Sequence, residues 1–336
     1  MLLVSLLLGG CAADAAPKRY EQVFLDVFDT VTTVIVYDTS EQRANETIEK
    51  LHTLLLEYHR RYDIFHTYEG VNNLATVNAN AGDAPVAVDD KILDMIEYAI
   101  SMDALTDGRM NIAMGGVLKI WQSYREAGLN DPEQAVLPPM DALLAANMHA
   151  SISNIILERT AGTLYITEAS TQLDVGAVAK GYAAQRAIAA MREAGVTSML
   201  LSLGGNVCSI GTRPDGTGWK VGIQNPYAGQ TLCVVQVSGQ SVVTSGTYER
   251  YYTVGGKRYH HIIDPETLMP SKRYDSVTVI SSDSALADAL TTGLFCMPID
   301  EGMALVERLP ETEALWVLSD GTQSMSSGFI TFLTTD

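Results

Sequence analysis

The pattern of apolar and polar positions in the first quarter of the chain predicts a strand followed by a long helix. Residues 20–38 are rich in β-branched side chains, which favour extended backbone, so we predict a first strand there. Apolar residues then recur in steps of three and four. This spacing predicts a helix over 39–65 whose buried face carries Ala44, Ile48, Leu51, Leu55, Tyr58 and Tyr62. The Asn-, Gly- and Ala-rich segment 66–88 predicts a loop with short turns.

The middle of the chain predicts further helices around one hairpin. A helix is predicted over 89–106, and Asp107-Gly108 ends it. Residues 122–150 predict a loop with a short helix, and residues 151–173 predict a strand hairpin. The Ala-rich segment 177–195 predicts a helix that ends at Gly195.

The last part of the chain predicts mostly strands. They are expected at 198–205, 218–225, 232–238 and 241–245, followed by a hairpin around Gly255-Gly256 and a strand at 276–282. A helix is predicted over 284–297, and Asp320-Gly321 predicts a final turn. Because no repeat or Pro-rich linker divides the chain, we predict one α+β domain with a mostly antiparallel sheet and flanking helices.

The composition argues against one class of binding partner. Of the 336 residues, 47% are apolar, which is enough for a sizeable core. There are 40 acidic and 22 basic side chains, so the formal net charge is −18. Nucleic-acid binding depends on basic side chains that neutralise phosphates, and this composition argues against it. An anionic substrate would need local cations, a metal or helix N-termini.

The N-terminal segment resembles a lipoprotein signal. Its apolar run ends at Cys11 and is too short to span a bilayer as a helix. The stretch LGGC at 8–11 resembles a lipobox, in which the signal is cut before a cysteine that becomes lipidated. We therefore predict a signal segment over 1–11, a tether over 12–20 and a folded domain over 21–336. The basic residues of a full signal are missing, so a start codon assigned at the wrong position is the alternative.

Several familiar kinds of site have no support in the sequence. Cys208, Cys233 and Cys296 lie in apolar surroundings and are odd in number, which indicates buried thiols more than disulfides or a thiol enzyme. No Cys/His spacing suggests zinc. No GxxxxGK[ST] or GxGxxG fingerprint is present, so a Walker or Rossmann phosphate site is not supported.

A first candidate site lies in LDVGAVAK, residues 173–180. Lys180 is predicted in the first turn of a helix, where its charge opposes the helix dipole. That placement makes sense if Lys180 meets an anion such as phosphate. Asp174 precedes the same helix, and a simple N-cap is the alternative for it.

A second candidate site lies in ALADALTTG, residues 285–293. Asp288 and Thr292 are four apart and share one helix face. Carboxylate and hydroxyl oxygens suit a hard cation such as Mg²⁺. A solvent-facing pair is the alternative, but the neighbouring residues are apolar nearly all round. Burial is therefore expected, and a buried Asp needs a partner.

Eight stretches, taken together, resemble one protein family. In order they are FDTVTTV (28–34), HTYEGVNNLATVN (66–78), TDGRMNIAMGGVLKIW (106–121), LDVGAVAKGYAAQRA (173–187), SLGGNVCSIG (202–211), TSGTYERYY (244–252), HIIDPETLMP (261–270) and ADALTTGLF (287–295). The set resembles the ApbE family of FAD:protein FMN transferases in order and spacing. The resemblance implies a T-fold-like α+β architecture and transfer of FMN from FAD, with Mg²⁺, onto a Thr or Ser hydroxyl of a partner protein such as a redox-pump subunit. It also implies release of AMP, and many members are lipoproteins outside the cytoplasmic membrane.

The resemblance also implies roles for individual residues. The metal ligands would be the carbonyl of Ala177 and the side chains of Asp288 and Thr292, with Thr291 as a further candidate. FAD would be contacted by a larger set: Phe28, Tyr68, Arg109, Met110, Asn111, Asp174, Lys180 and the segment from His261 to Ile262. Mg²⁺ and Lys180 would stabilise phosphate charge, and His261 would be the general base or a substrate-holding residue. Its neighbour His260 alternates to the other strand face and is expected at the surface.

The chain departs from the family pattern at three places. Phe28-Asp29-Thr30 stands where Met-Gly-Thr is frequent, Asn111 where Asp is frequent, and Leu268 where Gly is usual. None of these removes a predicted metal ligand or the histidine.

Two other functions remain open. The first is a Mg²⁺-dependent FAD pyrophosphatase, which would pass FMN to water. The second is a flavin-binding or solute-binding lipoprotein without enzymatic activity, which would not need the Asp288, Thr292 and Ala177 set.

Overall fold

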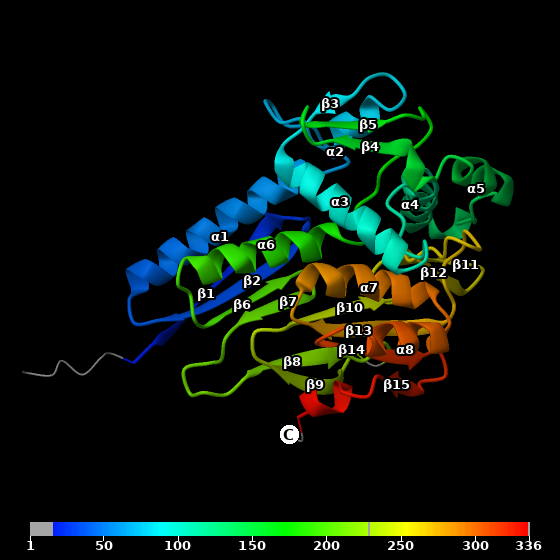
Figure 1. Ribbon diagram of the computed structural model, residues 1–336. Coiled ribbons are helices and arrows are strands. Elements are labelled where there is room, and N and C mark those ends of the chain that lie inside the picture. Colours follow the sequence, from blue (N-terminus) through cyan, green and yellow to red (C-terminus); the bar gives the residue numbers. More distant parts are fainter. Residues whose placement is uncertain (1–15, 228, 335–336) are drawn as a thin grey trace, which may run out of the picture.

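A computed structural model describes residues 16–227 and 229–334. Its centre is an eight-stranded sheet in the order β1-β2-β6-β7-β10-β13-β14-β15, and every neighbouring pair is antiparallel (Figure 1). The strands are β1 Lys18–Val27, β2 Thr30–Asp38, β6 Met199–Leu203, β7 Asn206–Ile210, β10 Ser241–Gly246, β13 Tyr274–Ser281, β14 Thr312–Leu318 and β15 Gln323–Met325. The predicted single α+β domain with a mostly antiparallel sheet is confirmed.

Helices cover one face of this sheet, and a hairpin covers part of the other. The helical layer consists of α1 Glu41–Tyr62, α3 Asp90–Leu105, α6 Ala179–Glu193, α7 Ser284–Cys296 and α8 Ile299–Glu307 (Figure 1). Apolar side chains of β8 Trp219–Gln224 and β9 Thr231–Val237 pack against Val242, Ile280 and Leu315 on the opposite face. Separate apolar cores therefore lie on the two faces of the sheet.

Smaller elements surround the end of the sheet where the candidate residues gather. They are α2 Leu74–Ala79, the small sheet of β3 Val86–Ala87, β5 Thr163–Ile166 and β4 Ile155–Glu158, the helices α4 Gly115–Asn130 and α5 Met140–Asn147, and the hairpin β11 Tyr251–Val254 with β12 Lys257–His260. Three short 3₁₀ turns lie at Pro132–Gln134, Ile152–Asn154 and Phe329–Phe332. Among the described residues, no helix is long and apolar enough to cross a membrane.

The helices predicted at 39–65, 89–106, 177–195 and 284–297 are confirmed as α1, α3, α6 and α7, with ends that differ by a few residues. The hairpin over 151–173 is confirmed as β4–β5, and Gly255-Gly256 joins β11 to β12 with φ values of 54° and 78°. The predicted single strand at 20–38 is wrong, because β1 and β2 form a hairpin whose turn is Phe28-Asp29. β1 also begins at Lys18, inside the segment we predicted as a tether.

The position of α4 was also mispredicted, because a 16-residue helix begins at Gly115 and continues into the predicted loop. Its first residue has to be glycine for packing, since a Cβ there would lie 2.5 Å from the carbonyl oxygen of Gln172. Two glycines at the start lower the intrinsic helix propensity, so the sequence signal was weak. The segment 66–88, predicted as loop, also contains α2 and β3.

Candidate active site

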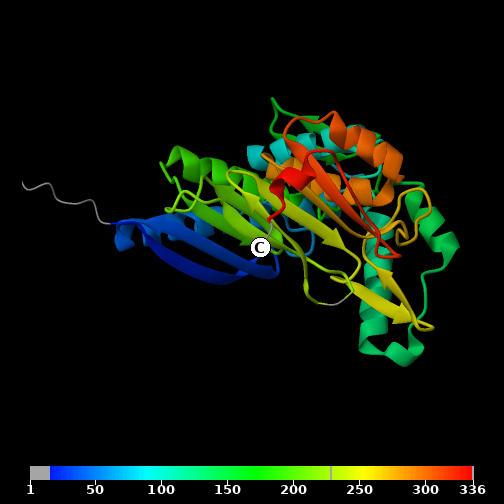
Figure 2. The same ribbon diagram turned by 90° about the horizontal axis from the view of Figure 1, so that it is seen from below.

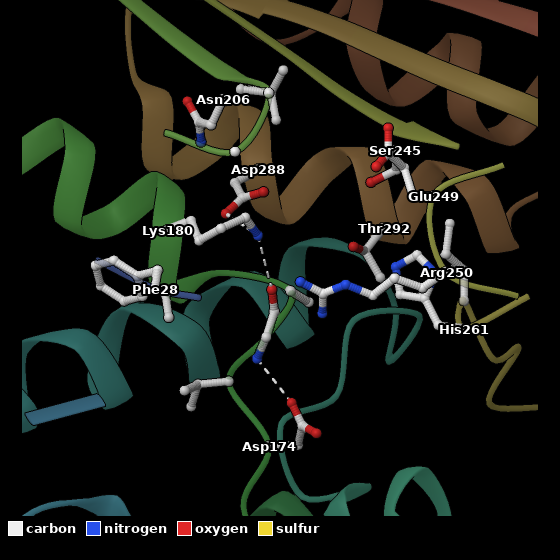
Figure 3. Close-up of a pocket in the computed structure, with 18 of the residues that line it drawn as sticks. Phe28, Asp174, Lys180, Asn206, Ser245, Glu249, Arg250, His261, Asp288 and Thr292 are labelled. Carbon is white, nitrogen blue, oxygen red and sulfur yellow. Dashed lines mark hydrogen bonds and ion pairs between the residues drawn. The ribbon is translucent and has the colours of Figure 1, made fainter. Parts of the chain in front are cut away.

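A cavity of about 870 Å³ lies at the end of the central sheet that the smaller elements surround. Its walls include the turn between β1 and β2, the start of α6, one face of α7, the end of β10 and the residues that follow β12. Most residues predicted to act on the substrate line it: Phe28, Arg109, Met110, Asn111, Asp174, Ala177, Lys180, His261, Ile262, Asp288 and Thr292. In Figure 3 Asp288 and Thr292 project from α7, with Lys180 beside Asp288 and with Arg250 and His261 on the side of Thr292.

The start of α6 packs directly on α7 and fixes Asp288. The backbone N–H of Gly181 donates to Oδ2 of Asp288 over 2.7 Å, and the Lys180 ammonium lies 3.9 Å from the same oxygen. A Cβ at position 181 would lie 2.3 Å from the Cβ of Asp288, so only glycine permits this approach. Burial raises the pKa of Asp288 despite the neighbouring Lys180 and the Gly181 amide.

The loop before α6 arranges Asp174 and Lys180 around Gly176. The Gly176 N–H donates to Oδ1 of Asp174 over 2.8 Å, and the Lys180 ammonium donates to the Gly176 carbonyl over 3.4 Å (Figure 3). Asp174 therefore closes a local turn and is not the helix N-cap, because α6 begins at Ala179 and no side chain caps it. Burial raises the pKa of Asp174, with the Gly176 amide and nearby cations acting in the opposite sense.

The residues fit a magnesium site with one exception. Asp288, Thr292 and Ala177 all line the cavity, and Oδ1 of Asp288 has no hydrogen-bond partner among the described residues. Thr291 is completely buried, donates to the carbonyl of Asp288 over 2.7 Å and accepts from Ser245 over 2.9 Å. It does not line the cavity, so we no longer assign it as a ligand.

The donor chemistry agrees with this assignment. No group of three His, Cys, Asp or Glu side chains suited to a metal occurs in the described part of the chain. A carboxylate, a hydroxyl and a carbonyl are oxygen ligands of the kind Mg²⁺ takes, and substrate phosphates commonly complete its coordination. A cation beside Asp288 would also favour the ionised carboxylate that burial disfavours.

The two adjacent histidines differ as alternation predicts, but His260 is not at the surface. His261 lines the cavity, and its Nδ1 is buried without a hydrogen-bond partner. Burial, followed by repulsion from Arg250, His260, Arg125 and Lys180, lowers the pKa of His261 to about 3. The ring is therefore neutral at pH 7, and one of its two nitrogens is able to accept a proton.

The expectation that His260 lies at the surface was wrong, because the face of the strand opposite to His261 packs against the apolar core that contains Phe295. His260 is 7% exposed and packs edge-on against Phe295. Its Nδ1 accepts from the Ile262 N–H over 3.2 Å, so its Nε2 donates to the Ser271 carbonyl, 2.7 Å away. Both ring nitrogens are used in holding the segment that carries His261.

Sequence reasoning missed two arginines in the cavity wall. Arg125 of α4 and Arg250 before β11 both line the cavity, and neither forms a side-chain hydrogen bond or ion pair among the described residues. Burial and repulsion from Arg250 lower the pKa of Arg125. Two unpaired cations side by side favour an anionic ligand. A single arginine on a helix or at a strand end gives no sequence signal of this kind.

The remaining predicted flavin contacts divide into three kinds. The Phe28 side chain lines the cavity, and its amide donates to Nδ1 of His59 over 3.2 Å. Arg109 is paired with Glu266 at 2.6 Å, and the Asn111 amide binds the backbone of Ala113 and Ala150. The side chains of Arg109 and Asn111 are therefore held by other protein groups and form part of the cavity wall.

Tyr68 is the exception among the predicted flavin contacts. It does not line the cavity, and its hydroxyl donates to Oδ2 of Asp63 over 2.7 Å. Asp63 itself lines the cavity, so Tyr68 positions a residue of the cavity wall and does not contact the space that a ligand would fill.

Comparison with known proteins agrees with this fold and site. The model of the ApbE family matches residues 28–316. A FAD:protein FMN transferase of Treponema pallidum is 32% identical over 341 residues, which cover 96% of this chain and 91% of that protein. One from Klebsiella pneumoniae is also 32% identical, over 83% of this chain and 85% of its own length. The crystal structure of the ApbE protein of Thermotoga maritima superposes with a TM-score of 0.80 at 26% identity and covers 94% of this chain and all of its own.

A buried carboxylate, free cations and a neutral histidine in one large cavity define a site for an anionic cofactor-sized ligand, and the chain belongs to the ApbE family. It is an enzyme of the type named in these relatives, a FAD:protein FMN transferase whose substrate is FAD. The sequence left open a flavin-binding lipoprotein without enzymatic activity, and we therefore reject that alternative.

Proposed function

We propose that this enzyme transfers FMN from FAD to a Thr or Ser hydroxyl of an acceptor protein, that AMP is released, and that Mg²⁺ bound at Asp288, Thr292 and the Ala177 carbonyl is required. The observation that carries the proposal is the charge arrangement in the cavity. A buried carboxylate with a free oxygen faces the unpaired cations Arg125 and Arg250. A metal-bound diphosphate would neutralise both, because the metal ion compensates the carboxylate and the phosphates compensate the two arginines.

The reaction breaks a phosphoanhydride bond and forms a phosphoester bond. The acceptor oxygen forms a bond to the phosphorus of the FMN half, and the bond from that phosphorus to the bridging oxygen breaks, so AMP leaves with the negative charge. Transfers of this type depend on positioning and on neutralising phosphate charge. Bound Mg²⁺ would supply Lewis-acid stabilisation of phosphate oxygens. Lys180 and Arg250 extend that positive field over the diphosphate.

The hydroxyl proton goes to His261 in this proposal. Its ring is neutral at neutral pH and so carries one unprotonated nitrogen, and no protein group hydrogen-bonds to Nδ1. Its low pKa makes His261 a weak base before substrate binds. A diphosphate between Arg250 and Lys180 would offset the positive field that lowers this pKa, so the base becomes stronger when substrate binds.

A product analysis separates this function from hydrolysis. The enzyme is incubated with FAD and Mg²⁺, with and without an FMN-accepting domain of a redox-pump subunit. Transfer predicts that AMP accumulates only with the acceptor, whose mass increases by one FMN. A pyrophosphatase would release AMP and free FMN equally in both samples, and that result would contradict the proposal.

The same proposal places the enzyme outside the cytoplasmic membrane on a lipid anchor. Its support is the LGGC sequence at 8–11, which ends at Cys11 and lies outside the described residues. The folded domain begins with β1 at Lys18, so a linker of only a few residues would separate it from the lipid. An acceptor on the same side of the membrane would be within reach.

A further inference from the structure

The hairpin β1–β2 carries an exposed apolar patch close to the cavity. Val23, Leu25 and Val31 are 51%, 73% and 57% exposed. They lie on the face of the hairpin that turns away from α1, because Phe24 stacks on His52 of α1 at 4.0 Å between ring centroids and neighbouring strand residues point to opposite faces. We refer to these three residues as the hairpin patch.

An irregularity in the strand pairing brings the patch together. Phe24 pairs with Thr32 and Val27 pairs with Thr30, so two residues of β1, Leu25 and Asp26, oppose the single residue Val31 of β2. Such a bulge changes the direction of the side chains and is frequent beside active sites. Here it places Leu25 opposite Val31 immediately before the turn.

The hairpin is held firmly from its helical side. His52 bonds to Asp26 at 2.9 Å as well as stacking on Phe24, and His59 accepts from the Phe28 amide at 3.2 Å. The turn residues Phe28 and Asp29 then form part of the cavity wall. One rigid hairpin therefore carries both the patch and a side of the cavity.

Nothing in the described part of the chain covers the patch. Further from the turn, Ile35 and Tyr37 on the same face of β2 pack against the β8–β9 hairpin. Nearer the turn this cover is missing, and Figure 2 shows the β1–β2 hairpin at the end of the molecule. β1 is an edge strand whose charged residues Lys18, Arg19 and Glu21 lie at the end away from the cavity. Charges protect a strand edge from unwanted association, and in the half of β1 near the cavity the one charged residue, Asp26, is bonded to His52.

We infer that the hairpin patch is a docking surface for the acceptor protein, which covers Val23, Leu25 and Val31 with an apolar surface next to its accepting hydroxyl. This inference rests on the proposed function. A hydroxyl on a folded protein reaches the cavity only if the acceptor surface around it also covers the rim. The patch is continuous with the cavity through the turn Phe28-Asp29, and the exposed side chain of Phe65 lines the cavity itself.

The test compares two substitutions at exposed leucines. Transfer to an FMN-accepting domain of a redox-pump subunit is measured at saturating FAD and Mg²⁺ while the acceptor concentration is varied. Leu25→Lys is expected to raise the KM for the acceptor by roughly tenfold, since an apolar contact is replaced by a charge. kcat, FAD affinity and melting temperature should stay unchanged. The matched control is Leu144→Lys on α5, where the leucine is also exposed, and it should leave the KM unchanged.

Several outcomes would overturn the inference. One is an unchanged acceptor KM in Leu25→Lys, and another is an equal rise in Leu144→Lys. A wild-type dimer that Leu25→Lys converts to a monomer, seen by light scattering, would make the patch a contact between two copies instead. If the wild-type enzyme modifies no acceptor at all, the proposed function fails first and the docking surface with it.

Discussion

The backbone amide of Gly181 donates to Asp288 over 2.7 Å, and this hydrogen bond joins the two helices that carry the site. Lys180 precedes Gly181 on α6, and Thr292 follows Asp288 by one turn on α7. The separation of the Lys180 ammonium from the proposed metal ligands is therefore set by helix packing. A side chain at position 181 would change that separation directly.

Gly181→Ala is expected to abolish transfer and to destabilise the fold. The new Cβ would meet the Cβ of Asp288 at 2.3 Å and the carbonyl of Ser284 at 2.5 Å, so the helices must move apart. Overpacking of this kind costs about 1–3 kcal/mol. Gly116→Ala in α4 is the control, because the nearest atom to its Cβ would be 3.8 Å away. Thermal melting and transfer assays that find the two variants alike would contradict the packing account.

Asp288→Asn is expected to stabilise the ligand-free protein while it removes function. The folded state raises the pKa of Asp288, so it holds the proton more tightly than the unfolded chain and loses stability as pH rises through the folded pKa. The asparagine side chain has no proton to release in this pH range, so the variant does not lose folding stability in this way. In chelator the variant should melt higher than wild type at pH 8, and the difference should shrink towards acidic pH.

The binding of FAD in Mg²⁺ should fall in the same variant by more than the roughly 10–100-fold typical of outer-sphere partners of a metal. Titration of FAD fluorescence with and without Mg²⁺ measures this change. Wild-type affinity in limiting Mg²⁺ would show that Asp288 is not a ligand.

His261→Ala is expected to slow the chemical step by roughly 10²–10⁴-fold and to leave FAD binding nearly intact. His260→Ala should instead lower the melting temperature, because the Ser271 carbonyl and the Ile262 amide lose their partners at a cost of about 1–3 kcal/mol. Single-turnover transfer at saturating FAD and Mg²⁺ measures the step. A His261 variant with normal rate and weak FAD binding would make His261 a binding residue only.

The pH profile provides a separate test of His261. Burial and the neighbouring cations lower the pKa of His261 to about 3, and only the neutral ring accepts a proton. kcat/KM for FAD reports the free enzyme, so it should show no limb near pH 6.5 that depends on His261. A limb at that pH that disappears in His261→Ala would mean that the ring is not buried among cations as the structure has it.

Elements with a strong local signal could be predicted from the sequence. The stripe of apolar residues in α1 specified its buried face, and Gly255-Gly256 specified the hairpin that leads to His261. The burial of Asp288 followed from apolar neighbours on every side of α7. In each case one short segment contained the physical cause, so no knowledge of distant contacts was needed.

Features that depend on distant contacts or on an unusual backbone could not be predicted. Phe28 and Asp29 form a tight turn with φ values of 52° and 51°, and Leu268 has φ 58°. Asp29 and Leu268 adopt the left-handed conformation that favours glycine, so the turns were hidden by residues that rarely adopt it. The burial of His260 and the grouping of Arg125 with Arg250 depend on elements far apart in sequence.

Cys11→Ser is expected to release the protein from membranes without loss of activity in solution. The lipid would be removed while the folded domain, which begins at Lys18, is untouched. Fractionation of cells that express either form, followed by transfer assays on both fractions, measures the effect. Continued membrane association of the variant would indicate a different anchor or no lipidation.

The most direct measurement of the central claim is the stoichiometry of one turnover. Enzyme, FAD and Mg²⁺ are mixed with an FMN-accepting domain and quenched over time, and AMP and FMN-modified acceptor are quantified in the same samples. The account predicts that the two products appear together in a one-to-one ratio and that both are lost in Asp288→Asn. AMP that forms with free FMN while the acceptor stays unmodified would contradict it.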